Sequence, residues 1–318
     1  MKIIVTVTMN PAIDTSSSVV HVIAERKLRC SVPRHEPGGG GINVSRAIKK
    51  LGGESLALYP AGGSYGQMLQ DLLDAEGLNH HPIPINGSTR ENFIIFEGSS
   101  GQQFRFGMPG PSMQDAELEL ILKVLTTIDP KPDYIVASGS LPSGAPNDFY
   151  ASMARIAKEI NARIIVDTSG EGLQAAVRAG VYLLKPNMNE LRTLAKQEIK
   201  DESQQVEVAR GIIENGQSEV VVVSLGAAGA LMVTKEGCER FRAPIVPIQS
   251  KVGAGDSMLA GIVLSLAQGK PVRDAVRFGV SAGSAAVMTP GTELCRREDT
   301  ERLYERMITD NSKNFNRN

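Results

Sequence analysis

Six short apolar runs, most of them rich in β-branched residues, recur along the chain with helix-like stretches between them. Unbroken apolar runs of this length are typical of strands buried on both faces of a parallel sheet, because strands with one wet face alternate instead. The regular succession of strand and helix predicts a doubly wound, mostly parallel α/β sheet with right-handed crossovers and flanking helices. The predicted strands are Ile3 to Val7, Ser55 to Pro60, Tyr134 to Ser138, Arg163 to Asp167, Val181 to Lys185 and Glu219 to Ser224.

The helices between these strands carry recognisable start signals. Asn147 and Ser203 are residue types that are preferred as helix N-caps. The segment from Gln114 to Ile128 places apolar side chains at helical spacing, which predicts a helix there.

Two stretches, residues 15–34 and 92–108, interrupt this rhythm because they are strand-like and have no helix within them. In the second stretch, Phe104 and Phe106 stand on either side of Arg105, which is the period of a sheet with two different faces. These stretches predict a small β layer that is inserted into the α/β domain and acts as a lid.

The predicted organisation is one α/β domain over residues 1–310, with the lid inserted from about 15–35 and 90–108. The polar end of the chain, residues 311–318, is expected to be a loose tail. A short sheet with an apolar face seldom stands alone, so we expect the lid to pack against a second copy in a homodimer.

Composition and charge narrow the functional classes. The 318 residues are 42% hydrophobic, and 34 Lys and Arg against 35 Asp and Glu leave a formal charge of −1. This balance, without a long run of one sign, favours neither a nucleic-acid nor a membrane partner. The three cysteines, Cys30, Cys238 and Cys295, are widely spaced, which favours reduced thiols in a cytoplasmic protein over disulfides or a zinc site. The first residues are typical of a strand rather than of a signal peptide or membrane span.

A glycine run, PGGGGINVSRAIKKLGG (Pro37 to Gly53), precedes one predicted helix. Its glycines could cradle a phosphate, but Asn43 stands where the third glycine of GxGxxG would fall, and the chain has no GxxxxGK[ST]. Neither the NAD-binding fingerprint nor the Walker loop is therefore present. By itself the run indicates a tight turn with close helix packing as readily as a ligand site.

Polar residues follow the predicted strands at their carboxyl ends, where open α/β sheets bind ligands. They are Asn10, Asp14 and the stretches SGSLPSG (Ser138 to Gly144), DTSGE (Asp167 to Glu171), KPNMNE (Lys185 to Glu190) and SLGAAGA (Ser224 to Ala230). Asn187 and Glu190 lie three residues apart at a helix start, so both point to one side. Such an oxygen pair can hold Mg²⁺ through waters, but a helix capping box is the simpler interpretation of these two residues alone.

The stretch SKVGAGDSMLAGIV (Ser250 to Val263) places small residues directly before an aspartate that opens an apolar helix. Glycines and the free amides of a helix start suit an anion. The amides of residues 253–255 could stabilise a transferring phosphoryl group while Asp256 takes the proton of the attacking hydroxyl. Aspartate is also a favoured N-cap residue, and the residues alone leave both interpretations open.

Taken together, these stretches resemble the PfkB (ribokinase-like) carbohydrate kinase family. The glycine run is similar to the family's amino-terminal signature, and Ser250 to Val263 is similar to its carboxyl-terminal signature, in which GAGD is the most specific element. The polar stretches follow between them in the family's order, so the resemblance covers roughly Ile3 to Tyr304. RKLRC (Arg26 to Cys30) and FRFGMPG (Phe104 to Gly110) resemble the branch of PfkB-type 6-phosphofructokinases.

The resemblance implies a role for each matching residue. The general base would be Asp256, with an anion hole formed by the amides of Gly253, Ala254 and Gly255. The sugar hydroxyls would contact Asp14, Gly39 and Asn43, and the sugar phosphate would contact Lys27, Arg90, Arg105 and Ser140. ATP would lie against Lys185, Asn187, Ser224, Gly226 and Gly229, with Mg²⁺ organised by Asn187 and Glu190. A K⁺ site, built largely from backbone carbonyls, would involve Ser250, Val252, Ala286, Thr289, Gly291 and Glu293.

The implied activity is the ATP-dependent phosphorylation of fructose 6-phosphate, with fructose 1-phosphate and tagatose 6-phosphate as close alternatives. The charge pattern also favours a phosphosugar, because Arg90 and Arg105 on neighbouring lid strands could chelate a phosphate dianion that a neutral sugar or nucleoside lacks. A non-catalytic nucleotide-binding protein is the alternative from another class, and the retained Asp256 argues against it. Lys251 departs from the family pattern, which usually has a small hydroxyl residue before GAGD.

Overall fold

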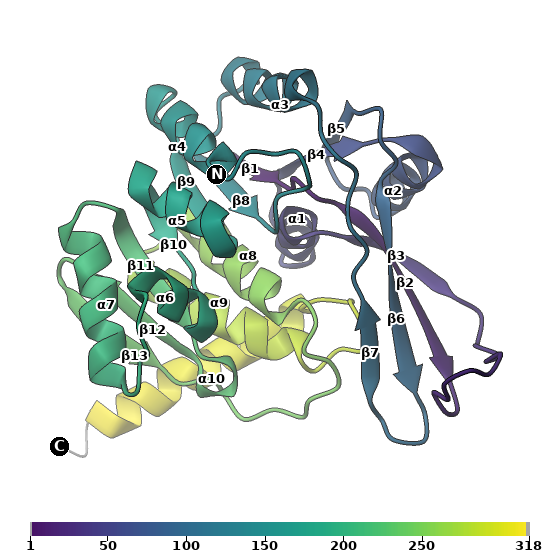
Figure 1. Cartoon of the computed structure of the whole chain (residues 1–318). Coiled ribbons are helices and arrows are strands. Elements are labelled where there is room, and N and C mark those ends of the chain that lie inside the picture. The colour runs from purple at the N-terminus through teal and green to yellow at the C-terminus, as the bar shows by residue number, and fades with distance from the viewer. Residues whose placement is uncertain (1, 316–318) are drawn as a thin grey trace.

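The computed structural model describes residues 2–315 and builds them around one large sheet with helices on both sides (Figure 1). The nine-stranded sheet has the order β13-β12-β11-β10-β9-β8-β1-β4-β5, and all neighbours from β11 to β5 are parallel. The strands are β1 (Ile4–Val7), β4 (Leu56–Ala61), β5 (His80–Pro84), β8 (Tyr134–Ser138), β9 (Arg163–Asp167), β10 (Val181–Leu184), β11 (Ser218–Ser224), β12 (Ala230–Thr234) and β13 (Gly237–Phe241). The predicted fold class is confirmed.

All six predicted strands are present, each within one residue of its expected bounds, and the remaining three lie at the edges of the sheet. Strand β5 was not predicted because its sequence HHPIP contains two prolines, which are uncommon within strands and occur mostly in edge strands such as this one. Strands β12 and β13 form an antiparallel pair, and β13 was not predicted because its sequence GCERF is mostly polar and only its last residue, Phe241, is buried.

The helices divide into two layers that each cover one face of the sheet. Buried side chains of α1 (Gly40–Lys50), α8 (Ala254–Ala267), α9 (Val272–Ala286) and α10 (Arg297–Phe315) share one core cluster. The opposite cluster contains side chains of α3 (Asp115–Thr127), α4 (Phe149–Glu159), α5 (Gly170–Ala179), α6 (Met188–Ala195) and α7 (Glu202–Glu214). Helix α2 (Gly63–Ala75) packs separately, with Ile13, Ile42 and Tyr59, beside the root of the lid.

Two helices are not capped by the residues that were predicted as their N-caps, Asn147 and Ser203. Helix α4 begins at Phe149 after Asp148, and the Asn147 side chain donates to Glu171 instead of capping. Helix α7 begins one residue before Ser203, and the carboxylate of Asp201 accepts from the Gln204 amide at 2.9 Å. An ionised carboxylate makes the stronger cap because the hydrogen bond is charge-assisted. The predicted helix from Gln114 is confirmed as α3.

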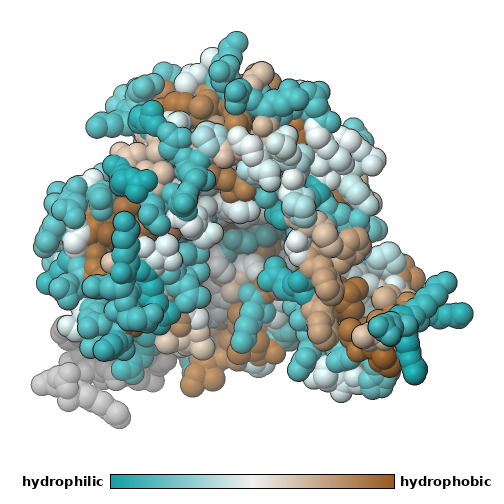
Figure 2. Space-filling view, in the orientation of Figure 1, coloured by the Kyte–Doolittle hydropathy of each residue, from teal (hydrophilic) through white to brown (hydrophobic). Residues whose placement is uncertain are grey.

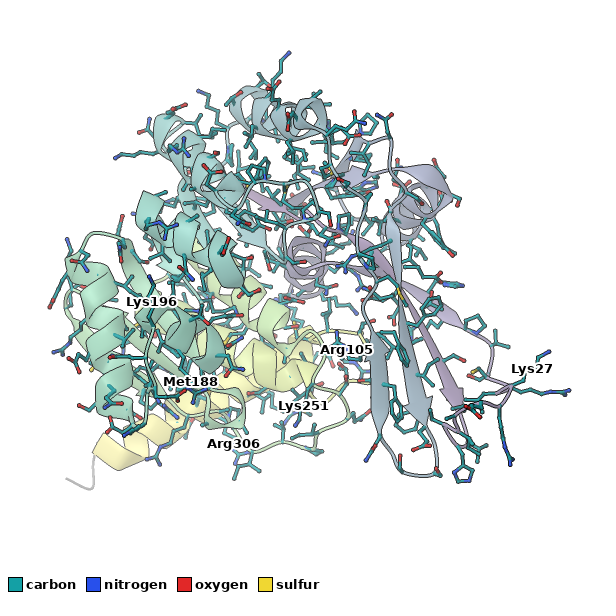
Figure 3. All side chains as sticks on the ribbon, viewed as in Figure 1. Lys27, Arg105, Met188, Lys196, Lys251 and Arg306 are labelled. Atoms are coloured by element: carbon teal, nitrogen blue, oxygen red, sulfur yellow. The ribbon has the colours of Figure 1, made fainter. Side chains whose placement is uncertain are left out.

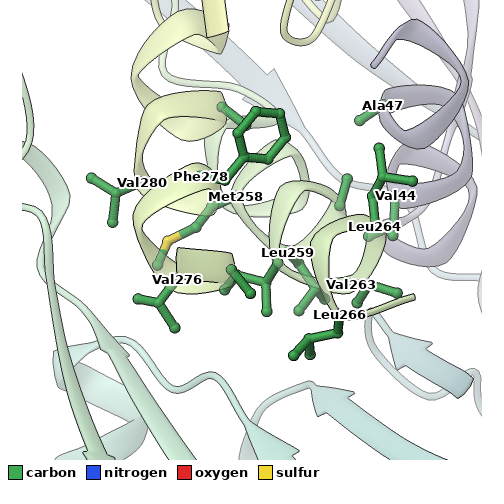
Figure 4. Packing of buried hydrophobic residues seen from close by; sticks show 14 of the residues in the cluster. Val44, Ala47, Met258, Leu259, Val263, Leu264, Leu266, Val276, Phe278 and Val280 are labelled. Carbon is green, nitrogen blue, oxygen red and sulfur yellow. The ribbon is translucent and has the colours of Figure 1, made fainter. Parts of the chain in front are cut away.

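Helix α8 is buried from Ser257 to its end because α1 and α9 pack across it, as Figure 4 shows for Leu259 and Val263. A Cβ on Gly261 would lie 3.0 Å from the Cα of Gly279, so α8 and α9 approach almost backbone to backbone. A helix that is apolar on every side is stable only inside a protein. The helix that begins at the GAGD stretch is thus held rigidly by the core.

The predicted small sheet is confirmed as a separate lid that projects from one end of the large sheet (Figure 1). Its order is β3-β2-β6-β7, with strands β2 (Ala12–Val19), β3 (Arg34–Gly38), β6 (Arg90–Glu97) and β7 (Gln103–Phe106). The register places Asp14 opposite Asn92 and Arg105 opposite Ile94. Two segments far apart in the sequence therefore build one surface.

The end of the chain differs from the expected loose tail, since helix α10 continues to Phe315. A helix that is already packed against the core adds one hydrogen bond for each further residue, so it extends at little cost. Residues 316–318 lie outside the described part of the chain. None of the helices within residues 2–315 has the length and apolar character needed to span a membrane.

Candidate active site

A cavity of about 520 Å³ lies between the lid and the carboxyl ends of the parallel strands. Figure 2 shows this side of the molecule hollowed between the main body and the lid. Both parts contribute lining residues, and the lining includes eight predicted site residues. They are Asp14, Gly39, Asn43, Arg90, Arg105, Val252, Gly253 and Asp256.

Asp256 lies in the first turn of α8, where the backbone turns sharply into the helix. Gly253 adopts a left-handed conformation at φ 73°, and a Cβ there would lie 2.4 Å from the Leu294 side chain. Only glycine fits this position. Because α8 begins at Ala254, Asp256 is the third helical residue and not the N-cap. The N-cap interpretation of Asp256 is therefore wrong, and its carboxylate is available to the cavity.

The pKa of the Asp256 carboxyl is raised well above the usual value of an aspartate. Burial raises its pKa most, the nearby Asp167 carboxylate raises it further, and the pKa reaches about 6. A hydrogen bond from Asn43 Nδ2, at 2.9 Å to Asp256 Oδ2, and the charge of Lys185 limit the rise. A base whose pKa approaches neutrality is well suited to take a proton near physiological pH.

Lys185 and Asp167 form a buried ion pair beside this carboxylate, with 2.9 Å between Nζ and Oδ2. Burial alone would lower the pKa of the Lys185 ammonium, but Asp167 outweighs it and leaves that pKa raised. Lys185 therefore stays charged. A Cβ on Gly255 would lie 3.7 Å from Lys185 Nζ, so this charge stands directly beside the GAGD turn.

Asp14 on β2 is held against the glycine run. Asn92 Nδ2 donates to Asp14 Oδ1 at 2.8 Å, and Asn92 Oδ1 accepts from the Met108 amide at 3.1 Å. A Cβ on Gly38 would lie 2.7 Å from the Asp14 carboxylate. The glycine therefore lets the β3 backbone approach Asp14, and Asn92 orients it. Sequence reasoning missed Asn92, because only the lid register places it opposite Asp14.

Arg90, Arg105 and Lys251 bring three cations to the same cavity. Arg90 donates to the carbonyls of Asn10 and Met108 at 2.9 and 3.0 Å, while its buried Nε has no partner among the described residues. Arg105 and Lys251 make no ion pair within residues 2–315, and Figure 3 shows both beside the space between lid and body. An unpaired buried N–H and two free cations are the groups that a phosphate would satisfy.

A second cavity, of about 610 Å³, adjoins the loop after β11 and the start of α6. Its lining includes Asn187, Ser224 and Gly226. Gly229 closes the same loop, where a Cβ would lie 1.9 Å from the Phe241 carbonyl oxygen, so no other residue fits. The structure thus brings four of the five residues that the resemblance assigned to ATP to this cavity and its loop, while the fifth, Lys185, is paired with Asp167.

Asn187 and Glu190 form the capping box that the residues alone favoured. The Asn187 Oδ1 accepts from the amides of Asn189 and Glu190 at 2.9 and 3.0 Å, and Glu190 Oε2 accepts from the Asn187 amide at 2.8 Å. Burial raises the pKa of the Glu190 carboxyl. The cap engages Glu190 Oε2 and leaves Oε1 outside it, so the Glu190 carboxylate retains an oxygen that can face a cation or its waters.

The two segments of the expected K⁺ site lie side by side. The amides of Gln249 and Ser250 both donate to the Val287 carbonyl, at 2.7 and 3.3 Å, which joins the loop before α8 to the end of α9. The carbonyl of Ala286 accepts from Thr289 Oγ1 at 2.8 Å, and the Glu293 carboxylate pairs with Arg296. The side chain of Glu293 is therefore already neutralised, which leaves backbone carbonyls as candidate ligands.

Two of the residues expected to bind the sugar phosphate lie outside the first cavity's lining. Lys27 is exposed on the loop between β2 and β3, at the far tip of the lid (Figure 3). Ser140 lies after β8, where its Oγ accepts from Asn10 Nδ2 at 3.3 Å. Asn10 Oδ1 is buried without a partner in the described residues, so Asn10 and Ser140 form a polar group next to the Arg90 guanidinium.

The comparisons with known proteins agree with this geometry. The model of the pfkB family carbohydrate kinases matches residues 4–299. The ATP-dependent 6-phosphofructokinase isozyme 2 of Mycobacterium tuberculosis is 45% identical over 302 residues, covering 95% of this chain and 89% of the relative. Its namesake from Escherichia coli is 40% identical, covering 95% and 97%. The 1-phosphofructokinase of Bacillus subtilis is 33% identical, covering 91% and 95%.

Solved structures give the same result. Phosphofructokinase-2 from E. coli in complex with potassium has a TM-score of 0.94 at 40% identity and covers 97% of this chain and 100% of its own. The same protein in complex with fructose 6-phosphate has a TM-score of 0.92 at 39% identity, with the same coverage. The fold is thus the ribokinase-like α/β fold, with its catalytic edge facing a small lid. The chain belongs to the pfkB family of carbohydrate kinases.

The acidity of Asp256 generates a first prediction. Because the raised pKa keeps the carboxyl protonated below about pH 6, we expect kcat/KM for sugar phosphorylation to fall tenfold per pH unit below that value. Asp256→Asn should lower kcat by about 10²- to 10⁴-fold, the usual contribution of a general base. Steady-state rates from pH 5 to 9 measure both effects. A folded mutant, verified by circular dichroism, that turns over like the wild type would show that Asp256 is not the base.

Proposed function

We propose that this chain phosphorylates fructose 6-phosphate with ATP and releases fructose 1,6-bisphosphate and ADP. The observation that carries the proposal is the cavity itself, whose lining combines the half-buried Asp256 carboxylate of raised pKa with lid cations that make no ion pair among the described residues. The relatives with 45% and 40% identity are both 6-phosphofructokinases, whereas the 1-phosphofructokinase is more distant at 33%. A hydroxyl at one end of the substrate and a phosphate at the other match this arrangement.

The reaction is assigned to the GAGD turn. Asp256 accepts the proton of the primary hydroxyl as that oxygen attacks the γ-phosphorus, and the bond from phosphorus to the β,γ-bridging oxygen breaks to release ADP. The amides of Gly253, Ala254 and Gly255 stabilise charge on the transferring group, helped by the positive end of α8. Asn43 orients the Asp256 carboxylate through its 2.9 Å hydrogen bond.

The sugar is held between Asp14 and the lid. The Asp14 carboxylate accepts hydrogen bonds from sugar hydroxyls, with Gly39 allowing a close approach at its φ of 114°. Arg90, through its unpaired Nε, and Arg105 contact the sugar phosphate, because a guanidinium fork matches the geometry of a phosphate. Ser140 and Asn10 complete this end of the cavity.

The nucleotide is assigned to the second cavity and to Lys185, which lies between it and Asp256. Lys185, Asn187, Ser224, Gly226 and Gly229 surround ATP in this proposal. Mg²⁺, held through water by Asn187 and Glu190, supplies positive charge that offsets the charge of the nucleotide phosphates. We place the enzyme in the cytoplasm, where its three free thiols stay reduced.

The substrate assignment predicts how the two arginines act. Replacing Arg90 and Arg105 by Ala should lower kcat/KM for fructose 6-phosphate by at least about 100-fold, because each charge-assisted hydrogen bond contributes about 1.5–3 kcal/mol. Fructose, which has no phosphate, should lose almost nothing. The measurement is kcat/KM for fructose 6-phosphate, fructose 1-phosphate, tagatose 6-phosphate and fructose with both enzymes.

The same panel separates the alternatives. A wild-type preference for fructose 1-phosphate or tagatose 6-phosphate by orders of magnitude would replace the substrate assignment. An equal loss for fructose and for fructose 6-phosphate in the double mutant would mean that the arginines shape the lid instead of binding phosphate. Absence of turnover with every sugar would favour a non-catalytic nucleotide-binding protein.

We further propose that K⁺ binds between the loop 250–252 and the loop 286–293. The contacts of Gln249 and Ser250 with Val287 support this, and the E. coli relative was solved with potassium. A cation there would fix the loop that leads into Gly253. At constant ionic strength, replacing K⁺ by Na⁺ should lower kcat about tenfold or more, with the steepest loss at low ATP. Equal rates in both salts would contradict this site.

The lid is also proposed to form a homodimer. Large apolar side chains on it are unusually exposed, including Val20 at 70%, Val32 at 89% and Phe96 at 46%, and Figure 2 shows apolar surface on its strands. Such a patch on a small sheet is typical of an interface. Because Lys27 lies outside the lining of its own chain's cavity, its proposed contact with a sugar phosphate requires the cavity of a second copy.

The dimer makes a prediction about assembly. Phe96→Glu should convert the wild-type dimer to a monomer, because it places a charge within the apolar lid surface. Leu120→Glu is the matched control, since Leu120 on α3 is similarly exposed, at 38%, and lies away from the lid. Sedimentation velocity gives the molecular mass in each case. A monomeric wild type, or a dimer that survives Phe96→Glu, would refute the lid interface.

A further inference from the structure

Arg46 is a buried cation that none of the roles above uses. It lies on α1 with 3% of its surface exposed, one turn after Asn43. Its Nε and NH2 grip the Glu76 carboxylate at 2.8 and 2.6 Å, which is a two-pronged ion pair between α1 and the end of α2. This ion pair does not use NH1, which points toward the candidate active site.

The NH1 group makes two contacts there. It donates to the Pro37 carbonyl at 3.1 Å and to Asn43 Oδ1 at 3.4 Å. A guanidinium has donors only, so the side facing it must present an oxygen. The Asn43 amide is therefore turned with its oxygen toward Arg46 and its Nδ2 toward Asp256, where the N–H donates at 2.9 Å. The opposite orientation would place two oxygens against each other at Asp256.

The contact with Pro37 acts on the sugar side of the cavity. Pro37 directly precedes Gly38, whose Cα faces the Asp14 carboxylate closely enough that a Cβ would lie 2.7 Å away. Residues 34–38 form β3, which pairs with β2 across Glu36 and Asp14. One guanidinium thus fixes both the amide that orients Asp256 and the strand end that supports Asp14.

We infer that Arg46 is a positioning residue for the phosphoryl transfer: anchored by Glu76, it sets the orientation of the Asn43 amide and thereby of the Asp256 carboxylate. This inference rests on the proposed function, in which Asp256 is the base. It differs from a purely structural role, because a buried ion pair often adds little net stability and its partners could be replaced by apolar groups. Here NH1 of Arg46 donates to Asn43, which in turn donates to Asp256.

The test is Arg46→Lys, which keeps the charge but removes the fork. We expect kcat to fall about tenfold, since one hydrogen bond to the Asn43 oxygen is lost, with little change in the KM for ATP. Without a fixed N–H donor the carboxylate of Asp256 holds its proton more strongly, so the acidic limb of the pH profile of kcat/KM should move to higher pH. A role in fold stability alone would not move that limb.

Other charges near Asp256 are the same in every variant. They are Asp167 after β9, Lys185 after β10, Asp14 on β2, Arg90 and Arg105 on the lid, and Lys251 before α8. The matched control is Arg277→Lys. Arg277 is also buried, at 6%, and pairs with Asp274 at 3.0 Å on α9. This control should lower the melting temperature without moving the acidic limb.

A second variant covers the case in which Arg46→Lys does not fold. Glu76→Asp keeps the charge but shortens the anchor at a partner that is one-third exposed, and it should give a smaller shift of the limb in the same direction. An unchanged limb in the folded variants, with kcat reduced no more than in Arg277→Lys, would overturn the inference. Full activity of Asp256→Asn would refute the proposed base itself. An unchanged limb together with an inactive Asp256→Asn would refute only the inference about Arg46.

Discussion

A half-buried carboxylate in the first turn of an apolar helix is the constraint around which the rest of this structure is arranged. Removing the charge of Asp256 from water is costly unless donors and cations compensate for it. The compensation comes from separate elements: Asn43 on α1, Lys185 after β10, and the free amides at the start of α8. These elements can meet only where a parallel sheet presents its carboxyl ends, so the fold and the acidity of one side chain are coupled.

Two parts of the molecule with different mechanical character share the site. Helix α8 is locked between α1 and α9, which gives Asp256 and the GAGD turn a fixed position. The lid is a four-stranded sheet with exposed apolar side chains, and it reaches the body through short connections at β2, β3 and β6. Helix α8 therefore fixes the position of the reacting groups. The lid encloses the substrate and must also let it enter and leave.

The sequence alone predicted the central strands because they are buried on both faces and so form unbroken apolar runs. It could not predict β5, whose prolines suit only an edge, or the pairing of β12 with β13. At the site, local motifs located Asp256, Asn187 and the glycine turns. Asn92 and Arg46 carried no local signal, because their importance comes from register and from contacts between α1, α2 and β3. The sequence also could not show that Lys27 lies outside the cavity, because its position depends on the length of the lid.

The charged side chains that line the cavity suit two ligands that are both anionic. Arg90, Arg105 and Lys251 line it and make no ion pair among residues 2–315, while Asp14 and Asp256 each accept a hydrogen bond from an asparagine side chain. Leaving a cation unpaired in a partly enclosed site costs more than an exposed lysine would, so a neutral ligand would leave this lining unbalanced. Lys251 adds its charge to this lining from the loop before α8. The excess of positive charge therefore favours ligands that carry phosphate at both ends of the reaction, which is the requirement of a phosphosugar kinase and not of a neutral-sugar kinase.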